Sequence, residues 1–228
     1  MLRFEVLTLF PEIFSSFLEE SLIKRALEKR LLSIGLSNFR KHGIGKHLQV
    51  DDSPYGGGPG MILRIEPLVL MLEEKKDFHQ SRGRETYTIL ISPQGQPFTQ
   101  KKAKELSQKN SVLTLVCGRY EGFDERIRSI VDEEISGGDF VCMGGEVISM
   151  AIIESVSRLL PGFLGNKKSS EQESFSQSLL EYPQYTRPAN FAGMNVPEDL
   201  LSGNHKKIAQ WRHQQALIRT KKRRPDLI

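Results

Sequence analysis

The stretch SVLTLVCGRYEG, residues 111–122, decides the fold, because an apolar, β-branched run ends there in a turn that holds two glycines. The run predicts a buried strand. Two neighbouring stretches repeat the pattern: TYTILISPQG (86–95) ends in a turn with proline and glycine, and ISGGDFVCMGGE (135–146) reads as an apolar strand bracketed by glycine pairs. Three strands that end in this way predict three glycine-bearing loops at one edge of a sheet.

Helical patterns separate these strands and the strands that precede them. An apolar run at 4–10 predicts a further strand, and LSIGLSNFRKHG (32–43) predicts another strand followed by a loop. Helices are expected at 12–31, 66–75, 98–110, 124–134 and 147–162. Strands that alternate with helices predict an α/β fold with a mostly parallel sheet that helices cover on both faces.

The composition limits the class of protein. The chain has 228 residues, a net charge of +4 and 38% hydrophobic residues, which suits one large domain or a main domain with a smaller partner. No stretch approaches the roughly 18 apolar residues of a membrane span. Cys117 and Cys142 lack metal-ligand spacing, so a reduced, cytoplasmic protein without a membrane partner is expected.

The charge is concentrated near the C-terminus. Residues 201–228 hold eight Lys or Arg and one Asp, together with Trp211 and two histidines. This pattern favours an anionic partner, above all a nucleic acid. The alternative is a solvated helix face with a basic tail. A polar, serine-rich stretch before it, GNKKSSEQESFSQS (165–178), is typical of a linker between domains.

Several kinds of chemistry are disfavoured. The glycine stretch GGGPGM (56–61) lacks the lysine and hydroxyl of a phosphate-binding P-loop, and no G-x-G-x-x-G joins a strand to a helix. The five histidines are scattered, which argues against a zinc or iron site. The loops carry few cations besides Arg119, so a neutral or cationic nucleoside is the favoured ligand. In the alternative interpretation, the glycines only form tight turns.

Long motifs in a fixed order point to a family. They are VDDSPYGGGPGM (50–61), LISPQGQPF (90–98), VCGRYEGFDER (116–126), DEEISGGDFVCMGGE (132–146), SVSRLLPG (155–162), ESF (173–175) and YTRP (185–188). Together they resemble the bacterial tRNA (guanine-N1)-methyltransferases, which are trefoil-knot methyltransferases. The resemblance runs nearly end to end.

The resemblance implies a knotted fold, which periodicity alone does not reveal. It implies a trefoil-knotted, mostly parallel catalytic domain at 1–163, a linker at 164–178, and a small, basic helical tRNA-binding domain at 179–228. It also implies transfer of a methyl group from S-adenosylmethionine to N1 of guanine 37 in tRNA, beside the anticodon. Family members are homodimers with active sites built from both chains. They are reported to depend on magnesium, for which the sequence shows no obvious site.

Carried over by resemblance, the contacts with S-adenosylmethionine fall on the three loops. They are Leu90, Ser92, Pro93 and Gly95 in the first loop; Gly118, Tyr120, Glu121 and Gly122 in the second; and Ser136, Gly138, Phe140, Cys142, Gly144 and Gly145 in the third. Phe140 departs from the family's usual tyrosine and lacks its hydroxyl. Cys142 and Met143 replace the usual leucine and small hydroxyl residue, which backbone contacts would tolerate.

Methylation of guanine N1 needs a base that removes its proton and a positive group at O6, where negative charge develops. The resemblance gives these roles to Glu173 and Arg158. The family has aspartate at Glu173, and the longer side chain requires a backbone shift on the order of 1 Å, a size of misplacement that can cost ~100-fold in rate. Glu171 is the alternative base. Arg158 could instead pair with Glu154 one helical turn earlier.

The substrate RNA is expected to meet four residues, Asp51, Gly58, Gly60 and Ser169. Glycines would let the RNA approach the backbone closely. A knotted enzyme that acts on another RNA, such as ribosomal RNA, is one rival interpretation. A noncatalytic RNA-binding protein is another, and a phosphate-binding NTPase is the weakest.

Overall fold

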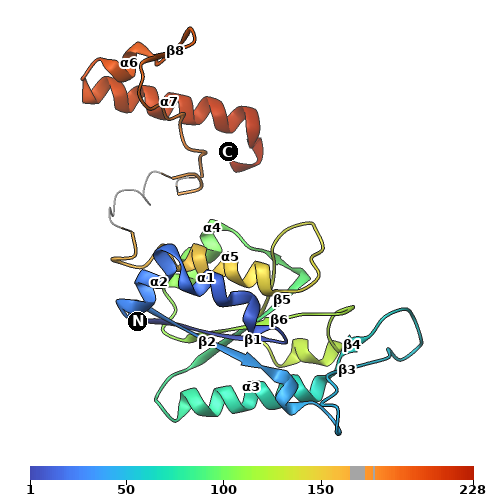
Figure 1. Cartoon of the computed structure of the whole chain (residues 1–228). Helices are drawn as coiled ribbons and strands as arrows, with labels where there is room; N and C mark the ends of the chain where they lie inside the picture. Colours follow the sequence, from blue (N-terminus) through green and yellow to red (C-terminus); the bar gives the residue numbers. More distant parts are fainter. Residues whose placement is uncertain (165–172, 177) are drawn as a thin grey trace. The chain divides into compact units, whose positions relative to one another are not determined.

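The computed structural model describes residues 1–164, 173–176 and 178–228. The chain divides into two compact units, Met1–Gly165 and Asn166–Ile228 (Figure 1). Most of the expected linker, with Ser169 and Glu171, lies outside the described residues.

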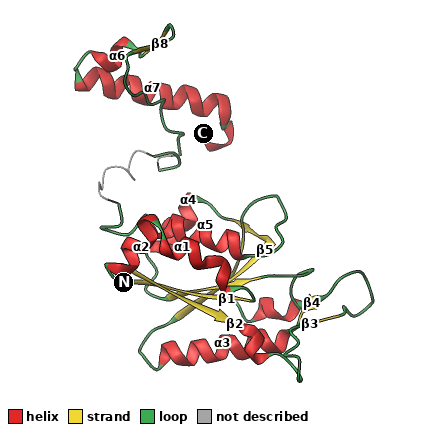
Figure 2. Cartoon of the chain, viewed as in Figure 1, coloured by secondary structure: helices red, strands yellow, loops and turns green. Residues whose placement is uncertain are grey.

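A five-stranded parallel sheet forms the centre of the first unit (Figure 2). Its strands are β1 (Leu2–Thr8), β2 (Leu32–Asn38), β5 (Thr86–Pro97), β6 (Val112–Cys117) and β7 (Glu133–Ser136), in the order β2-β1-β6-β5-β7. Every residue of β6 is buried, as expected for a central parallel strand with both faces covered. The α/β class predicted from the sequence is confirmed.

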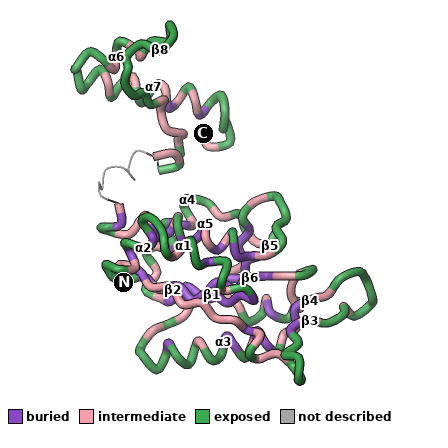
Figure 3. The backbone as a smooth tube through the Cα atoms, in the orientation of Figure 1, coloured by how far each residue is buried: buried purple, intermediate pink, exposed green. Residues whose placement is uncertain are grey.

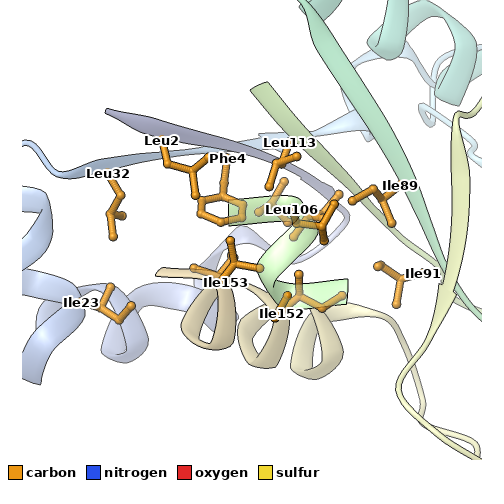
Figure 4. Close-up of a cluster of buried hydrophobic side chains, with 14 of the residues drawn as sticks. Leu2, Phe4, Ile23, Leu32, Ile89, Ile91, Leu106, Leu113, Ile152 and Ile153 are labelled. Carbon is orange, nitrogen blue, oxygen red and sulfur yellow. The ribbon is translucent and has the colours of Figure 1, made fainter. Parts of the chain in front are cut away.

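Helices cover both faces of this sheet. They are η1 (Pro11–Phe14), α1 (Ser15–Glu19), α2 (Ser21–Glu28), η2 (Phe39–His42), α3 (Ile65–Gln80), α4 (Gln100–Ser107), η3 (Glu125–Ser129) and α5 (Glu146–Ser157). Figure 4 shows one core cluster, in which Ile23 of α2, Leu106 of α4 and Ile152 of α5 lie on one side of the strands. A second cluster joins α3 to the sheet through Leu68 and Met71. Figure 3 shows the buried centre that these layers enclose.

Two of the three sequence stretches that define the loops fold differently from expectation. The strand expected to end at Pro93 continues to Pro97, because residues 92–95 bulge out and both Ile91 and Gln96 pair with Ile135. Proline lacks the N–H that an unbroken ladder needs. The expected strand at 135–146 is wrong beyond Ser136: β7 ends there, and Gly138, at a φ of +138°, turns the chain into a loop.

The helix expected at 124–134 is also wrong in part. Only η3 is helical, and β7 begins at Glu133. The acidic run looks unsuited to a strand, but ion pairs compensate it: Lys102 Nζ lies 2.6 Å from Glu133, and Arg128 lies 3.1 Å from Glu134. An edge strand tolerates such paired charges.

The second unit is small and mostly helical, as the sequence predicts. It contains the short strands β8 (Asn190–Phe191) and β9 (Met194–Asn195), helices α6 (Glu198–Leu201) and α7 (His205–Arg223), and η5 (Pro225–Leu227). Asn204 caps α7 by accepting hydrogen bonds from two backbone N–H groups. The backbone N–H of Leu180 donates to the Thr220 hydroxyl at 2.9 Å and ties the preceding segment to α7.

A buried polar cluster lies between β1 and α3. The Glu5 carboxylate accepts from the Ser37 hydroxyl at 2.8 Å and pairs with Lys75 Nζ at 2.8 Å, and His79 Nε2 lies 3.5 Å away. Burial lowers the pKa of His79 below its ordinary value, despite the nearby Glu5 carboxylate. The imidazole is therefore neutral at neutral pH.

This neutral imidazole predicts a loss of stability in acid. The unfolded chain takes up a proton on His79 near its ordinary pKa of about 6.5, whereas the folded chain does so only at lower pH. The stability that the neutral imidazole contributes is therefore present above the unfolded-state pKa of about 6.5. It is lost as the pH falls below that pKa toward the lower pKa of the folded chain. Between pH 7.5 and 5.5, the Tm of the unmodified chain should fall further than that of His79→Gln. The exposed His47→Gln serves as the matched control, and parallel losses in all three proteins would contradict a neutral buried His79.

Candidate functional site

A cavity of about 290 Å³ lies where the three glycine-bearing loops meet. It opens beside the carboxyl ends of β5, β6 and β7, the edge where parallel α/β sheets bind ligands. Most of the residues expected to contact a cofactor line it: Ser92, Pro93, Gly118, Tyr120, Glu121, Gly122, Ser136, Phe140, Cys142, Gly144 and Gly145. The volume is close to the lower end of the range for small-molecule sites, ~300–1,000 Å³.

The loops approach one another through backbone contacts that require glycine. The N–H of Gly145 donates to the carbonyl of Gly118 at 3.0 Å, and a Cβ at Gly145 would lie 2.9 Å from Cys117 Cα. A Cβ at Gly95 would lie 2.5 Å from the backbone nitrogen of Ile135. No side chain fits at either position without displacing backbone. These glycines therefore hold the second and third loops, and the bulge and β7, in contact.

Three of the expected cofactor contacts do not line the cavity. Leu90 is fully buried in the core cluster beneath α3. Gly95 packs against β7, and Gly138 makes the turn after that strand. In this structure Leu90 belongs to the core of the sheet, and the two glycines shape the bulge and the third loop.

The cavity has an apolar rim, and the cysteine next to its second loop is buried beneath it. Phe140 and Met143 of the third loop expose 55% and 89% of their surface and give that loop an apolar lip. Cys117, at the end of β6, is buried in the core with its Sγ 3.2 Å from the Ser149 hydroxyl and does not line the cavity, and burial raises the pKa of its thiol. A thiol with a raised pKa stays protonated, which makes Cys117 a poor nucleophile.

A buried ion pair between Arg119 and Glu146 supports the cavity wall, and the sequence did not predict it. The Glu146 carboxylate accepts from Arg119 Nε at 3.1 Å, lies 3.0 Å from a terminal guanidinium nitrogen, and accepts from the Thr8 hydroxyl at 2.7 Å. The guanidinium also lies 4.5 Å from the ring centroid of Phe10. These contacts fix the direction of the Arg119 side chain. The signals in the sequence were a lone cation in the second loop and a lone acid at the start of an apolar helix.

A second cation, Arg128, also lines the cavity, although the sequence did not single it out. It bridges two parts of the rim. It donates to the Glu134 carboxylate at 3.1 Å and to the Gln94 side-chain carbonyl at 3.1 Å. A third partner, Glu125, is exposed on the rim. The bulge within β5 and the strand β7 are therefore connected through the guanidinium of Arg128.

The C-terminal end of the stretch DDSPYGGGPGM (51–61) lies against the second loop. The backbone N–H of Glu121 donates to the carbonyl of Met61 at 3.0 Å, and a Cβ at Gly60 would collide with the Glu121 side chain. Asp51 pairs with Leu63 in a short hairpin, β3 (Asp51–Asp52) with β4 (Ile62–Leu63). Of the residues expected near the RNA, Gly60 therefore adjoins the cavity, whereas Asp51 and Gly58 do not line it.

The two expected catalytic residues do not line this cavity. Arg158 caps the C-terminal end of α5, whereas the cavity adjoins its N-terminal end, about 18 Å away at ~1.5 Å per residue. Glu173 belongs to the other compact unit, where it lines a separate cavity of about 270 Å³ beside α7. Ser169 and the alternative base Glu171 lie outside the described residues.

Within residues 1–164, 173–176 and 178–228, no group of three or more His, Cys, Asp or Glu side chains is arranged to hold a metal ion. Over the same residues, no helix has both the length and the apolar character that crossing a membrane requires.

The fold and the cavity define a class: an α/β protein with a ligand site made by glycine loops at the carboxyl edge of a parallel sheet. Comparison with known proteins identifies the family. Residues 2–228 match the family described as tRNA (Guanine-1)-methyltransferase TrmD. The chain belongs to this family and is a methyltransferase enzyme.

Curated relatives match over the whole chain. A tRNA (guanine-N(1)-)-methyltransferase of Carboxydothermus hydrogenoformans is 50% identical over 228 residues, which are 100% of this chain and 87% of the relative. Proteins of the same description from Staphylococcus epidermidis and Staphylococcus aureus strain JH9 are also 50% identical over the whole chain and 91% of their own length. Because the fold of this family is knotted, membership supports the knotted fold class that the sequence predicted.

Proposed function

We propose that this enzyme transfers a methyl group from S-adenosylmethionine to N1 of guanine 37 in tRNA. The observation that carries the proposal is the cavity formed by the three loops, in a chain that matches the family over nearly its whole length. The basic second unit supports an RNA substrate, because phosphate contacts dominate the affinity of proteins for nucleic acids. We expect the enzyme to act in the cytoplasm, where tRNA is modified.

The residues around the cavity fit a nucleoside that carries a positive charge. Backbone groups at the glycine positions can contact such a ligand closely, and the third loop offers an apolar wall. The Glu121 carboxylate lines the cavity, while Glu146 already compensates the charge of Arg119 and Glu125 pairs with Arg128. When bound, S-adenosylmethionine supplies a methyl group on a positively charged sulfur, which is already a good electrophile.

The remaining chemistry belongs to the guanine. Its N1 carries a proton and is a weak nucleophile until the proton is removed. We infer that Glu173 takes this proton and that Arg158 stabilises the negative charge that develops on O6. Magnesium is given no step in this mechanism, because the described residues offer no cluster of ligands that suits it.

We further propose that the enzyme is a homodimer whose active site both chains share. Within one chain, Arg158 follows the C-terminal end of α5, whereas the cavity adjoins the N-terminal end of that helix, which supports its supply to the site by a second chain. Exposed apolar side chains support such an interface. Phe10 lies just before η1 and Ile13 lies within it, and each is 43% exposed. Val147, at the start of α5, is exposed as well.

The function is tested by incubating tRNA with the enzyme and S-adenosylmethionine and analysing its nucleosides by mass spectrometry. N1-methylguanosine should appear in tRNA with guanine 37 and not in the same tRNA with adenine at that position. Product from both tRNAs would contradict the position. Product from ribosomal RNA alone would favour the rival enzyme, and binding of RNA without any product would favour a noncatalytic protein.

Two substitutions in the glycine stretch are expected to affect tRNA more than the methyl donor. Gly58 has a φ of +136°, which valine adopts only with strain, so Gly58→Val should distort the surface that meets the RNA. Asp51→Ala removes a carboxylate expected near the guanine. Both variants should raise KM for tRNA while calorimetry shows little change in affinity for S-adenosylmethionine.

A matched control for this prediction is Gly83→Val, which strains another glycine of positive φ in the turn after α3. Gly83 precedes the amino end of β5, whereas the cavity adjoins the carboxyl end, so neither ligand should be affected. If donor affinity falls as far as tRNA affinity in Gly58→Val and Asp51→Ala, the glycine stretch lies against the donor and not against the RNA, and the prediction is wrong.

A further inference from the structure

A second cavity, of about 490 Å³, lies wholly within the C-terminal unit. Tyr182, Tyr185, Arg187 and Arg212 contribute its aromatic and cationic lining. Leu200 of α6 and Ile208 of α7 are among its apolar residues. It shares Tyr182, Ile208 and Arg212 with the smaller cavity that Glu173 lines.

The aromatic side chains of the cavity offer ring faces to a planar ligand. The Arg212 guanidinium stacks on the Tyr182 ring at 4.8 Å from its centroid. The Tyr185 ring lies 6.4 Å from that of Trp211 and remains about half exposed, at 49% of its surface. Tyrosine rings and a guanidinium plane are the groups on which proteins stack the bases of single-stranded RNA.

The charge around the cavity suits a polyanion. Residues 179–228 hold nine Lys or Arg against four Asp or Glu, whereas residues 1–178 hold 23 against 24. Among the described residues that line the cavity, two are arginines and none is acidic. Asp199, the nearby acid on α6, already pairs with Lys207 at 3.0 Å. Phosphates next to a bound base would therefore meet two arginines and no carboxylate in the lining of this cavity, whereas Glu173 and Glu181 line the adjacent cavity that shares Arg212.

We propose that this cavity binds one unstacked nucleobase of the tRNA, stacked on Tyr185, with a flanking phosphate held by Arg187 and Arg212. The proposal rests on the proposed function, since it deepens how the same tRNA is bound. An acidic peptide would use the arginines but not the exposed ring face and the apolar floor. A nucleobase with its phosphate uses all three features.

Trp211 makes the proposal directly measurable, because it is the only tryptophan of the chain and its ring neighbours Tyr185. The full-length protein is titrated with an anticodon stem-loop RNA while Trp211 fluorescence and RNA anisotropy are recorded. The titration is then repeated with a series of abasic RNAs, each of which lacks one loop base but keeps every phosphate. One abasic position should abolish the fluorescence change and raise Kd about ten-fold, because stacking contributes ~1–3 kcal/mol per base.

Variants of the same ring test the protein side. Tyr185→Ala should weaken RNA binding by about 5- to 150-fold, the equivalent of ~1–3 kcal/mol, and should make the abasic and intact RNAs bind equally. Tyr185→Phe keeps the ring and should restore both affinity and discrimination. Phe191→Ala is the matched control, because this aromatic of β8 is 66% exposed and does not line the cavity. Far-UV circular dichroism verifies that each variant is folded.

The outcomes separate this proposal from the proposed function. If every abasic RNA binds like the intact one and leaves the fluorescence change intact, no base enters the cavity and the proposal fails, even while tRNA methylation proceeds. The abasic series decides this on the unmodified protein, whatever happens to the variants. If an acidic peptide competes with RNA for Trp211 while all abasic RNAs behave alike, the cavity is a peptide site. If no N1-methylguanosine forms at all, the proposed function fails instead.

Discussion

Glu173→Gln is expected to bind S-adenosylmethionine and tRNA normally but to lower kcat for methylation by about 100- to 10,000-fold, the usual contribution of a general base. The amide has nearly the same shape as the carboxylate but cannot accept the N1 proton. Single-turnover assays with saturating enzyme measure the effect on chemistry alone. Calorimetry with S-adenosylmethionine establishes that the donor still binds.

Two further variants sharpen this experiment. Glu173→Asp introduces the residue of the family pattern and should retain substantial activity, because the acid–base group is preserved. Glu181→Gln alters another carboxylate of the same unit and should leave kcat unchanged. Near-normal turnover in Glu173→Gln would contradict the assignment of Glu173 as the base, and Glu171 would then be the next candidate to test.

Glu146→Ala is expected to destabilise the first unit by about 3–5 kcal/mol, the usual effect of removing one partner from a buried ion pair. The Glu146 side chain is 2% exposed and that of Arg119 is 18% exposed. Its loss would leave the guanidinium without its carboxylate and the Thr8 hydroxyl without its acceptor. Urea denaturation measures the change, and affinity for S-adenosylmethionine should fall because Arg119 is no longer held in the cavity wall.

Glu125→Ala is the comparison for this variant. Glu125 pairs with Arg128 on the rim of the same cavity, but its side chain is 81% exposed. Exposed pairs contribute about 0–1 kcal/mol, so this variant should remain nearly as stable as the unmodified chain. An equally small effect of Glu146→Ala would contradict a structural role for the buried pair.

Much of the fold could be predicted from local patterns. Continuous apolar runs such as 112–117 are long enough and rich enough in β-branched residues to specify buried parallel strands. The glycine turns after them correctly indicated the edge at which the cavity forms. Boundaries that depend on distant partners were missed: Glu133 enters a strand because Lys102 neutralises it, and the β5 bulge exists because two of its residues share Ile135.

The candidate site was predictable to a lesser degree, for the same reason. The glycine turns indicated the three loops, whereas the individual cavity residues were expected by resemblance to the family, and most of them line the cavity. The Arg119–Glu146 pair joins residues 27 positions apart, and nothing local indicates that the two side chains meet. The distance of Arg158 from the cavity depends on the length of α5 and its direction from the third loop. Sequence motifs record neither of these.

The hydrogen bond between Glu121 and Met61 joins the second loop to the glycine stretch, so the surfaces that we propose for the donor and for the guanine share one piece of backbone. A shift of the second loop on donor binding would therefore be transmitted to the glycine stretch that we expect to face the guanine. Thermodynamic linkage then requires the influence to run both ways and by the same factor. A compound that fills the donor cavity but holds this loop in another position would thus act as an antagonist of RNA binding without touching the RNA.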